Sequence, residues 1–502
     1  MRSKKAIYNI ITNLALQAVA IIYGFIIPKI IIDYFGSDVN GLVSSITQFL
    51  AYIALLESGF GPVVKATLYK PLAKKDNSTI ANILKASEKF FRRIALIFVL
   101  YIIVLCFVFP FIAKADFDIV FTVSLVLIIG ISTFAEYYFG MTYRLFLQAE
   151  QKTYIISIIQ IVTYILSVIA VVIMAVAGCG ILVIKLVTAL IFIMRPLAQN
   201  YYVKHKYKIN IKEASGNYKI KQKWDGLAQH IAAVIHNNTD VTILTIFTTL
   251  AEVSVYSVYY LVIAGIKKIV QSFNNGLDAS FGDMIAKKED DNLRKKFSSY
   301  ELLYTIITTI IFVTTILLIT PFISIYTKGV NDADYYRPVF GCLLVISEYI
   351  WAIRLPYSSI TLAAGHFRET RKGAWVEALT NIIISLILVP KFGIVGVTVG
   401  TIVAMLIRTI EFTYHANKYI LKRSILESVA KITLSVMSVV IVSVIFCFVK
   451  LPTPDGYLSW MVNAMVVLAV ACIVTFALYY AAYGKDLKKI LKRGVKLIKR
   501  KK

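Results

Sequence analysis

The chain has 502 residues, of which 58% are hydrophobic and only 16% charged, and its formal net charge is +26. A soluble globular domain is nearer half apolar and a quarter charged, so this composition excludes a soluble enzyme or binding module. The apolar residues come in long runs, without the short alternating strands of a transmembrane β-barrel. The composition therefore predicts an all-α polytopic membrane protein. The five cysteines stand singly, with no CxxC pair, and are expected to be small hydrophobes rather than ligands or disulfides.

Apolar runs of about 20 residues predict about 14 transmembrane helices. The first run follows a basic start, is too long for the apolar part of a signal peptide and has no small-residue cleavage site after it, so we expect it to be retained. The fourteen predicted spans are 6–27, 40–64, 94–112, 119–143, 154–177, 181–203, 226–249, 253–275, 301–326, 339–362, 374–390, 393–415, 428–449 and 459–483.

The basic residues sort unevenly between the two faces of this topology. Most of the 54 lysines and arginines fall on the face that carries both termini. The opposite face receives only Lys29, Lys114, Lys185, Lys328, Arg337, Lys391 and Lys450. The positive-inside rule then predicts that both termini are cytoplasmic. Topology and contact with anionic lipid headgroups explain the positive charge, and no nucleic-acid partner is expected.

The chain also contains an internal duplication. Five short matches recur in the same order and at nearly one spacing in the two halves of the sequence. They are AKKD at 73–76 and AKKE at 286–289, Pro110-Phe111-Ile112 and Pro321-Phe322-Ile323, Leu147-Gln148-Ala149 and Leu362-Ala363-Ala364, Gly180-Ile181 and Gly393-Ile394, and Arg195 and Arg408. The AKKD and AKKE segments are expected to be short amphipathic helices at the membrane surface.

The duplication predicts a domain order. Two six-helix bundles, 1–215 and 216–425, are followed by transmembrane helices 13 and 14 in 426–484 and a basic cytoplasmic tail in 485–502. Because six is even, both halves enter the membrane from the same side and form parallel repeats. A substrate site is expected where such repeats meet, and their rocking would give alternating access.

Several segments resemble a known family of transporters. They are PKIIIDYFGSDVNGL after span 1, ESGFGP in span 2, FLQAEQKTY after span 4, NNTDVTIL in span 7 and SVYSVYYL in span 8. Together they resemble bacterial polysaccharide flippases, the O-antigen or capsule repeat-unit exporters of the multidrug/oligosaccharidyl-lipid/polysaccharide (MOP) superfamily. The resemblance implies a V-shaped, MATE-like pair of six-helix bundles. It also implies a substrate in the form of an undecaprenyl-pyrophosphate-linked oligosaccharide, moved from the inner to the outer leaflet of the bacterial cytoplasmic membrane.

Polar residues inside the first helix of each half are candidates for the lining of the substrate site. In span 7, Gln229, His236 and Asp240 fall along one helix face, and a polar face within a span must meet protein or water. The residues predicted to contact the substrate on these helices are Asn13, Gln17, His236 and Asn237. Interhelical hydrogen bonds without a ligand are the alternative role.

Three cations lie about fifteen residues into their spans: Lys267 and Lys268 in span 8, and Arg354 in span 10. A charge at the bilayer centre costs roughly 2.5–3.5 kcal/mol on insertion scales, and an anionic headgroup would offset that cost. We therefore predict that these cations bind the pyrophosphate. Adjacent lysines cannot both face the site, and the sequence does not decide between them. The alternative for Arg354 is an intramembrane ion pair with Glu348, Glu136 or Glu57.

Four acidic residues are candidates for coupling transport to H+ or Na+: Glu57, Glu136, Asp240 and Glu348. Structural pairing is the alternative role for each of them. Glu57 directly precedes a Gly- and Pro-containing break in span 2, which predicts a bend that could act as a hinge. No other cofactor and no metal site is expected.

Other functions compete with the polysaccharide flippase. A flippase for the peptidoglycan precursor lipid II is not separated from it, because the carrier lipid is the same. A cation-coupled multidrug exporter would need an acidic cavity free of cations, which Arg354 and Lys267-Lys268 argue against. An enzyme is excluded because no long external loop, P-loop, metal cluster or nucleophile elbow is present. The expected partners are the lipid-linked oligosaccharide, membrane lipids and the polysaccharide polymerase machinery.

Overall fold

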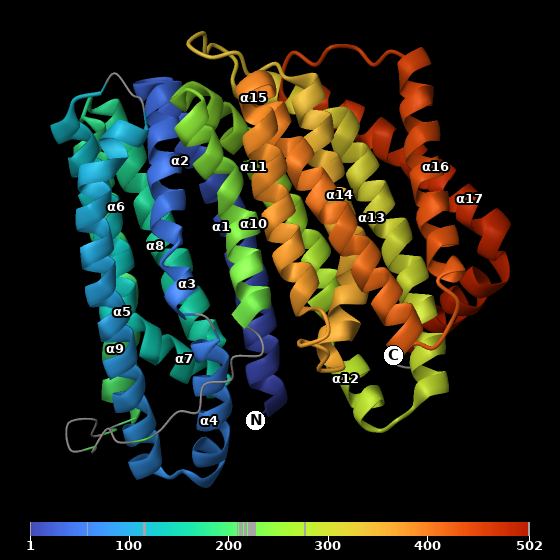
Figure 1. The fold of residues 1–502 in the computed structure, drawn as a ribbon, viewed down its shortest axis with the longest axis horizontal. Helices are drawn as coiled ribbons and strands as arrows, with labels where there is room; N and C mark the ends of the chain where they lie inside the picture. Colours follow the sequence, from blue (N-terminus) through green and yellow to red (C-terminus); the bar gives the residue numbers. More distant parts are fainter. Residues whose placement is uncertain are drawn as a thin grey trace. The chain divides into compact units, whose positions relative to one another are not determined.

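A computed structural model describes residues 2–57, 59–113, 117–207, 227–275 and 278–499, with the isolated positions 209, 214 and 218. Side chains are described except at residues 2–4, 6, 227–229, 232–233, 236–237, 275, 278–279, 491 and 493–499. The described residues form helices and connecting turns, with no strand among them (Figure 1). This confirms the predicted all-α class.

Packing divides the chain into two compact units, of which unit 1 comprises Met1–Ser257 and Gly329–Ala333. Its helices are α1 (Arg2–Phe35), α2 (Ser37–Ala51), α3 (Ala54–Glu57), α4 (Phe60–Lys74), α5 (Asn77–Ile112), α6 (Ile119–Ala135), the π-helical turn η1 (Glu136–Gly140), α7 (Met141–Ala149), α8 (Thr153–Val176), α9 (Ile181–Tyr207), α10 (Leu227–Phe247) and the start of α11 (Leu250–Asn275).

Unit 2 comprises Val258–Lys328 and Asp334–Lys502. Its helices are the rest of α11, α12 (Asp278–Ala286), α13 (Asp290–Tyr326), α14 (Pro338–Ala363), α15 (Arg371–His415), the π-helical turn η3 (Ala416–Ile420), α16 (Leu426–Phe448) and α17 (Tyr457–Lys499). Packing thus groups α10 with unit 1. The boundaries predicted from the duplication, 1–215 and 216–425, describe the sequence repeat. The division into packing units does not test them, so they stay a prediction.

Twelve helices among the described residues are long and apolar enough to cross a membrane. One of them, Arg371–Ile420, is broken by the non-helical backbone of Gly393 (φ 52°, ψ −130°) and covers the two predicted spans 374–390 and 393–415. The predicted span 226–249 falls on α10, which is not among the twelve. In the described part of the chain the predicted apolar runs are thus helical, although the run 40–64 is divided among three helices.

The predicted break in span 2 is present. Helix α3 ends at Glu57, and α4 begins after Gly59, whose φ of 76° is left-handed. A left-handed residue interrupts the helical hydrogen-bond ladder, and glycine adopts it without steric cost. The span expected to run over 40–64 is therefore divided between α2, α3 and α4, and its membrane-crossing part ends at Glu57.

The AKKD and AKKE segments lie at the C-terminal ends of the short helices α4 and α12 and in the turns that follow, so neither segment forms a separate amphipathic helix. Lys75 (φ 57°) and Lys288 (φ 56°) are both left-handed and end the preceding helix. In unit 1 the Asp76 side chain then accepts a hydrogen bond from the Thr79 amide (3.0 Å) and caps α5. The turn is short because a left-handed residue followed by an N-cap reverses the chain within two positions. The same backbone feature recurs at equivalent positions of the two repeats, which supports the duplication.

The start of α2 is capped from a distant part of the sequence within unit 1. Asp332 accepts hydrogen bonds from the Ser37 amide (2.6 Å) and the Ser37 hydroxyl (2.7 Å). Gly36 precedes the helix with a φ of 87°, and a Cβ there would lie 2.9 Å from an Asp332 carboxylate oxygen. A carboxylate at a helix N-terminus satisfies amides that have no intrahelical partner. Asp332 thus supplies the cap that the residue before α2 cannot provide.

Candidate functional site

In unit 2, Lys267 on α11 forms an ion pair with Glu348 on α14 (Nζ to Oε2, 2.8 Å). Both side chains are largely buried, and the ammonium lies over the Trp351 ring, 4.6 Å from its centre. The neighbouring Lys268 is exposed. Of the two adjacent lysines, Lys267 therefore points into the helix packing of unit 2, where a carboxylate and an aromatic face already surround its charge.

Arg354 on α14 forms an ion pair with Glu377 on α15 (Nη1 to Oε1, 2.5 Å). The three partners considered from the sequence, Glu348, Glu136 and Glu57, are therefore wrong for the ion-pair alternative. Glu348 is taken by Lys267, which reaches it from another helix. Helical rotation and helix–helix register decide such pairing, and neither is visible in residue spacing along one span.

A second arginine shares Glu377. Arg408, further along α15 and 1% exposed, places its Nε 3.4 Å from the other carboxylate oxygen, Oε2. Arg408 also pairs with Glu411 and donates to the Thr370 carbonyl (2.9 Å). The three cations of this region are matched by three carboxylates: Lys267, Arg354 and Arg408 with Glu348, Glu377 and Glu411.

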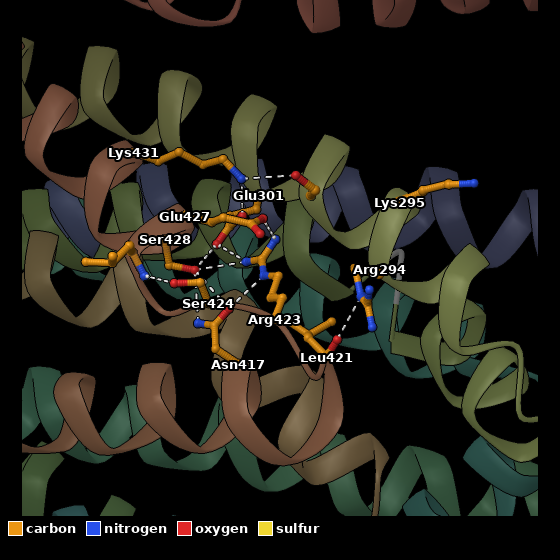
Figure 2. A network of polar contacts seen from close by, with 12 residues as sticks. Arg294, Lys295, Glu301, Asn417, Leu421, Arg423, Ser424, Glu427, Ser428 and Lys431 are labelled. Carbon is orange, nitrogen blue, oxygen red and sulfur yellow. Dashed lines mark hydrogen bonds and ion pairs between the residues drawn. The ribbon is translucent and has the colours of Figure 1, made fainter.

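A larger buried network lies where α13, α14, η3 and α16 meet (Figure 2). Glu301 on α13 is 1% exposed and accepts from Arg423 (2.7 Å), Ser428 (2.6 Å) and Tyr357 (2.7 Å), and it pairs with Lys431. Lys431 and Ser428 belong to α16, the first helix after the duplicated part of the chain. A carboxylate with these partners is satisfied internally, so the network anchors α16 to the repeat rather than forming a ligand site.

The arginine at the equivalent position of unit 1 has different surroundings. Arg195 on α9 donates from Nε to the Thr163 hydroxyl (2.7 Å) on α8. Its guanidinium lies 4.4 Å from the centre of the Tyr164 ring and 3.8 Å from that of Phe192. Arg195 forms no ion pair with a carboxylate among the residues that the structure describes. Aromatic faces and a hydroxyl stabilise the guanidinium, without a carboxylate at ion-pair distance in the described part of the chain.

Unfilled hydrogen-bonding capacity surrounds Arg195. Its Nη2 and the Oγ of Ser167 on α8 are buried and have no hydrogen-bond partner in the described part of the chain. Tyr23 on α1 completes a three-ring group, with its ring centre 4.6 Å from that of Tyr164 and 6.0 Å from that of Phe192. Buried donors in native proteins are almost always paired with protein, water or a ligand. The group combines a cation, polar atoms and aromatic faces, which are the elements that bind a phosphorylated sugar.

The predicted ion-coupling residues all have hydrogen-bonded or ionic partners. In unit 1, Glu57 accepts from the Tyr137 hydroxyl (3.2 Å), and Glu136 on η1 pairs with Arg144 (2.5 Å). Asp240 on α10 is 5% exposed and accepts from the Tyr256 hydroxyl (2.9 Å). Glu348 is the partner of Lys267 in unit 2. Glu57 and Asp240 are thus bound by neutral hydroxyls in these contacts, whereas Glu136 and Glu348 are bound by cations.

The polar residues of α1 differ in their surroundings along the helix. Asn9 accepts from the Tyr154 amide and donates to the Gln151 carbonyl, both at 2.9 Å, which ties α1 to the turn before α8. Further along α1, Asn13 is exposed and Gln17 is partly buried. The predicted substrate residues His236 and Asn237 on α10 lie outside the described side chains, so their role stays a prediction.

Sequence reasoning missed Glu377, Glu411 and Glu301, and it counted Arg408 and Arg195 among the basic residues of the face that carries both termini. The repeat of Arg195 as Arg408, at the spacing of the duplication, was the available signal that these arginines belong to the helix packing. Among the described residues, no group of three or more His, Cys, Asp or Glu side chains could hold a metal ion.

Several solved structures share this fold. The structure of the lipid II flippase MurJ in an inward closed conformation superposes with a TM-score of 0.68 and 13% identity, over 95% of this chain and 99% of that chain. An inward-facing multidrug resistance MATE family transporter of the MOP superfamily gives 0.63 and 14%, over 81% and 98%. A MOP superfamily transporter from Pyrococcus furiosus gives 0.52 and 11%, over 84% and 97%.

No protein-family model matches the sequence, and no curated protein matches it. The similarity to solved structures is therefore one of fold. The chain has the fold of the MOP-superfamily transporters, a class of multi-span helical membrane proteins, and its structural neighbours are flippases and exporters.

Proposed function

We propose that this protein is a flippase that moves undecaprenyl-pyrophosphate-linked oligosaccharide repeat units from the inner to the outer leaflet of the cytoplasmic membrane. The cycle exposes the headgroup first to one leaflet and then to the other, and its product feeds the synthesis of O-antigen or capsule. The observation that carries the proposal is Arg195, a guanidinium inside unit 1 that has no ion pair among the described residues and lies among three aromatic rings.

The chemistry of this group favours an anionic, sugar-bearing ligand over a cationic drug. A planar guanidinium donates in parallel to phosphate oxygens, and tyrosine rings stack on sugar faces. A cationic substrate would be repelled by Arg195 and would need a carboxylate there. Lys267 and Arg354, first considered as headgroup contacts, are paired with Glu348 and Glu377, so they contribute only when those pairs open.

A second candidate is the export of lipid II itself. The lipid II flippase MurJ covers 95% of this chain, whereas the two other reported neighbours cover 81% and 84%. Its likeness thus extends over more of the chain, and the two candidates share the polyprenyl-pyrophosphate carrier. They differ in the group attached to the pyrophosphate, so one reconstitution with both substrates separates them.

The test is translocation by the purified full-length protein in lipid vesicles loaded with undecaprenyl-pyrophosphate-linked repeat unit or with lipid II. Arg195→Ala should lower translocation roughly tenfold or more, the scale of one lost charge-assisted contact. Arg195→Lys should recover part of the rate, because the charge remains but the planar stacking is lost. Arg92→Ala, which removes an arginine of the same unit that pairs with Glu88, is the matched control.

Three outcomes would contradict the proposal. Unchanged translocation in Arg195→Ala would remove the observation on which the proposal rests. Movement of lipid II alone would favour the second candidate. Movement of neither lipid, together with efflux of cationic dyes, would favour a multidrug exporter.

A further inference from the structure

The carboxylate of Glu377 is shared between two arginines through two different oxygens. Arg354 reaches Oε1 at 2.5 Å, and Arg408 reaches Oε2 at 3.4 Å. Glu377 is 6% exposed, so a partner is required to compensate its charge. With two partners available, the loss of one contact does not leave the carboxylate alone.

The two arginines are not held equally. Arg408 is 1% exposed and also contacts Glu411, the Thr370 carbonyl and the Phe412 ring, whose centre lies 4.1 Å from its guanidinium carbon. For Arg354, Glu377 is the single hydrogen-bonding partner among the described residues, and its side chain is 11% exposed. If one arginine leaves Glu377, the contacts therefore favour the departure of Arg354.

Arg408 has a second carboxylate partner, Glu411, that does not depend on Arg354. Glu411 approaches it across Gly373, where a Cβ would lie 1.6 Å from a Glu411 carboxylate oxygen. A residue with any side chain at position 373 would displace Glu411. Gly373 thus permits a second carboxylate beside Arg408, which keeps Arg408 compensated and in place whether or not Arg354 is bound to Glu377.

We propose that Glu377 is an internal competitor for Arg354. In the empty transporter it holds the guanidinium, and a phosphate group of the substrate displaces it, while Arg408 remains on Glu377 and compensates its charge. This inference rests on the proposed function, because it requires an anionic ligand. It assigns Glu377 and Arg408 as positioning residues that set the affinity of Arg354 for phosphate without contacting the substrate.

The test measures binding of geranylgeranyl pyrophosphate to the purified full-length protein in detergent, with geranylgeraniol as the phosphate-free control. Glu377→Gln keeps the shape of the side chain but removes the competing charge, so affinity should rise roughly three- to tenfold. Arg354→Gln should lower it. In the double variant, the gain from Glu377→Gln should vanish, because the arginine for which it competes is absent.

Arg408→Gln tests the second half of the proposal. Without Arg408, release of Arg354 would leave the buried Glu377 without an arginine, so affinity for the pyrophosphate should fall. Adding Glu377→Gln should restore it, because no carboxylate then needs compensation. A role of Arg408 in fold stability alone would give no such rescue. Thermal unfolding and size-exclusion profiles identify any variant that fails to fold. If the Arg408 variants fail to fold, the double-mutant cycle of Glu377 and Arg354 still tests the proposal.

The outcomes separate this inference from the proposed function. If the native protein binds geranylgeranyl pyrophosphate no better than geranylgeraniol, the proposed function fails. If the native protein prefers the pyrophosphate, the proposed function stands. The competitor role is then overturned if Glu377→Gln has the same affinity as the native protein, or if Glu377→Gln has the same effect with and without Arg354.

Discussion

Arg195 and Arg408 occupy the same position of the duplicated sequence, yet their surroundings differ in charge. Arg408 of unit 2 lies against Glu377 and Glu411. Arg195 of unit 1 lies over Tyr164, and Tyr164 stands where the repeat places Glu377. Two differences between the repeats, Tyr164 for Glu377 and Ala198 for Glu411, thus separate an arginine paired with two carboxylates from one that has no ion pair among the described residues. Duplication gives both units the same cation, and the residue opposite it decides whether the cation is structural or available to a ligand.

A hydrogen bond between a tyrosine and a glutamate, by contrast, is found in both units. Tyr143 donates to Glu88 in unit 1 (2.5 Å), and Tyr357 donates to Glu301 in unit 2 (2.7 Å). The two glutamates are separated by the same spacing as Arg195 and Arg408. In unit 2 the glutamate has in addition gained Arg423 and Lys431 from the segment that follows the duplicated part. A tyrosine–glutamate contact is thus present in both units, and in unit 2 the same glutamate also binds side chains of α16.

The largest expected effect distinguishes these two glutamates. Glu301→Gln would leave Lys431 buried without its carboxylate and Arg423 with only the more exposed Glu427. Loss of one partner from a buried ion pair costs about 3–5 kcal/mol. Glu88→Gln keeps an acceptor for the Tyr143 hydroxyl and loses only the charge and the partly exposed pair with Arg92 (3.8 Å), so it should cost about 1 kcal/mol or less. Thermal unfolding in detergent should therefore show a much lower midpoint for Glu301→Gln. Equal midpoints would show that the buried cations of unit 2 find other partners.

Two closely packed glycines, one in each unit, differ in the kind of atom that a side chain there would meet. In unit 1, a Cβ at Gly41 would lie 1.8 Å from the Leu250 carbonyl oxygen, which belongs to backbone and cannot turn aside. In unit 2, a Cβ at Gly373 would meet the end of the Glu411 side chain, which can rotate away. Gly41→Ala should thus cost about 1–3 kcal/mol of stability and Gly373→Ala less. The unfolding midpoints of the two variants check this order, and a reversed order would contradict it.

One substitution can give Arg195 one of the two carboxylates that Arg408 has. Tyr164→Glu places beside Arg195 the carboxylate that unit 2 has at Glu377, so Arg195 should become ion-paired. Translocation should fall roughly tenfold, the effect of about 1.4 kcal/mol, while Tyr164→Phe retains the aromatic face and should fall less. Translocation of the lipid-linked oligosaccharide into vesicles measures both variants. Native activity in Tyr164→Glu would show that Arg195 does not need a free charge.

The smallest effect concerns the repeated turns before α5 and α13. Hydrogen bonds from the Thr79 side chain and amide lower the pKa of Asp76 below its ordinary value. The ionised cap therefore contributes stability at neutral pH, and the contribution is lost as the pH falls through the lowered pKa. Asp76→Ala should slightly lower the unfolding midpoint at neutral pH and converge with the native protein in acid. Glu289, which makes no side-chain cap bond to α13, should show no such convergence when changed to Ala.

The sequence alone was sufficient for the class of protein, the helical segments and the duplication. Runs of about 20 apolar residues must form helices in lipid, because every backbone amide and carbonyl needs a partner within the segment. The break in span 2 was equally local, since Gly59 permits a left-handed backbone. The recurrence of Arg195 as Arg408 was visible in the sequence, because the two arginines are separated by the spacing of the other repeated matches.

Only the tertiary structure decided which charges pair. Arg354 was expected to meet a ligand or one of three carboxylates, and its partner is Glu377 on another helix. Lys267 rather than Lys268 turned inward, and the arginine that has no ion pair among the described residues is Arg195 in unit 1. The physical reason is that an ion pair between helices depends on the rotation and axial register of both. Those quantities follow from the packing of many apolar side chains at once and not from the order of residues in either helix.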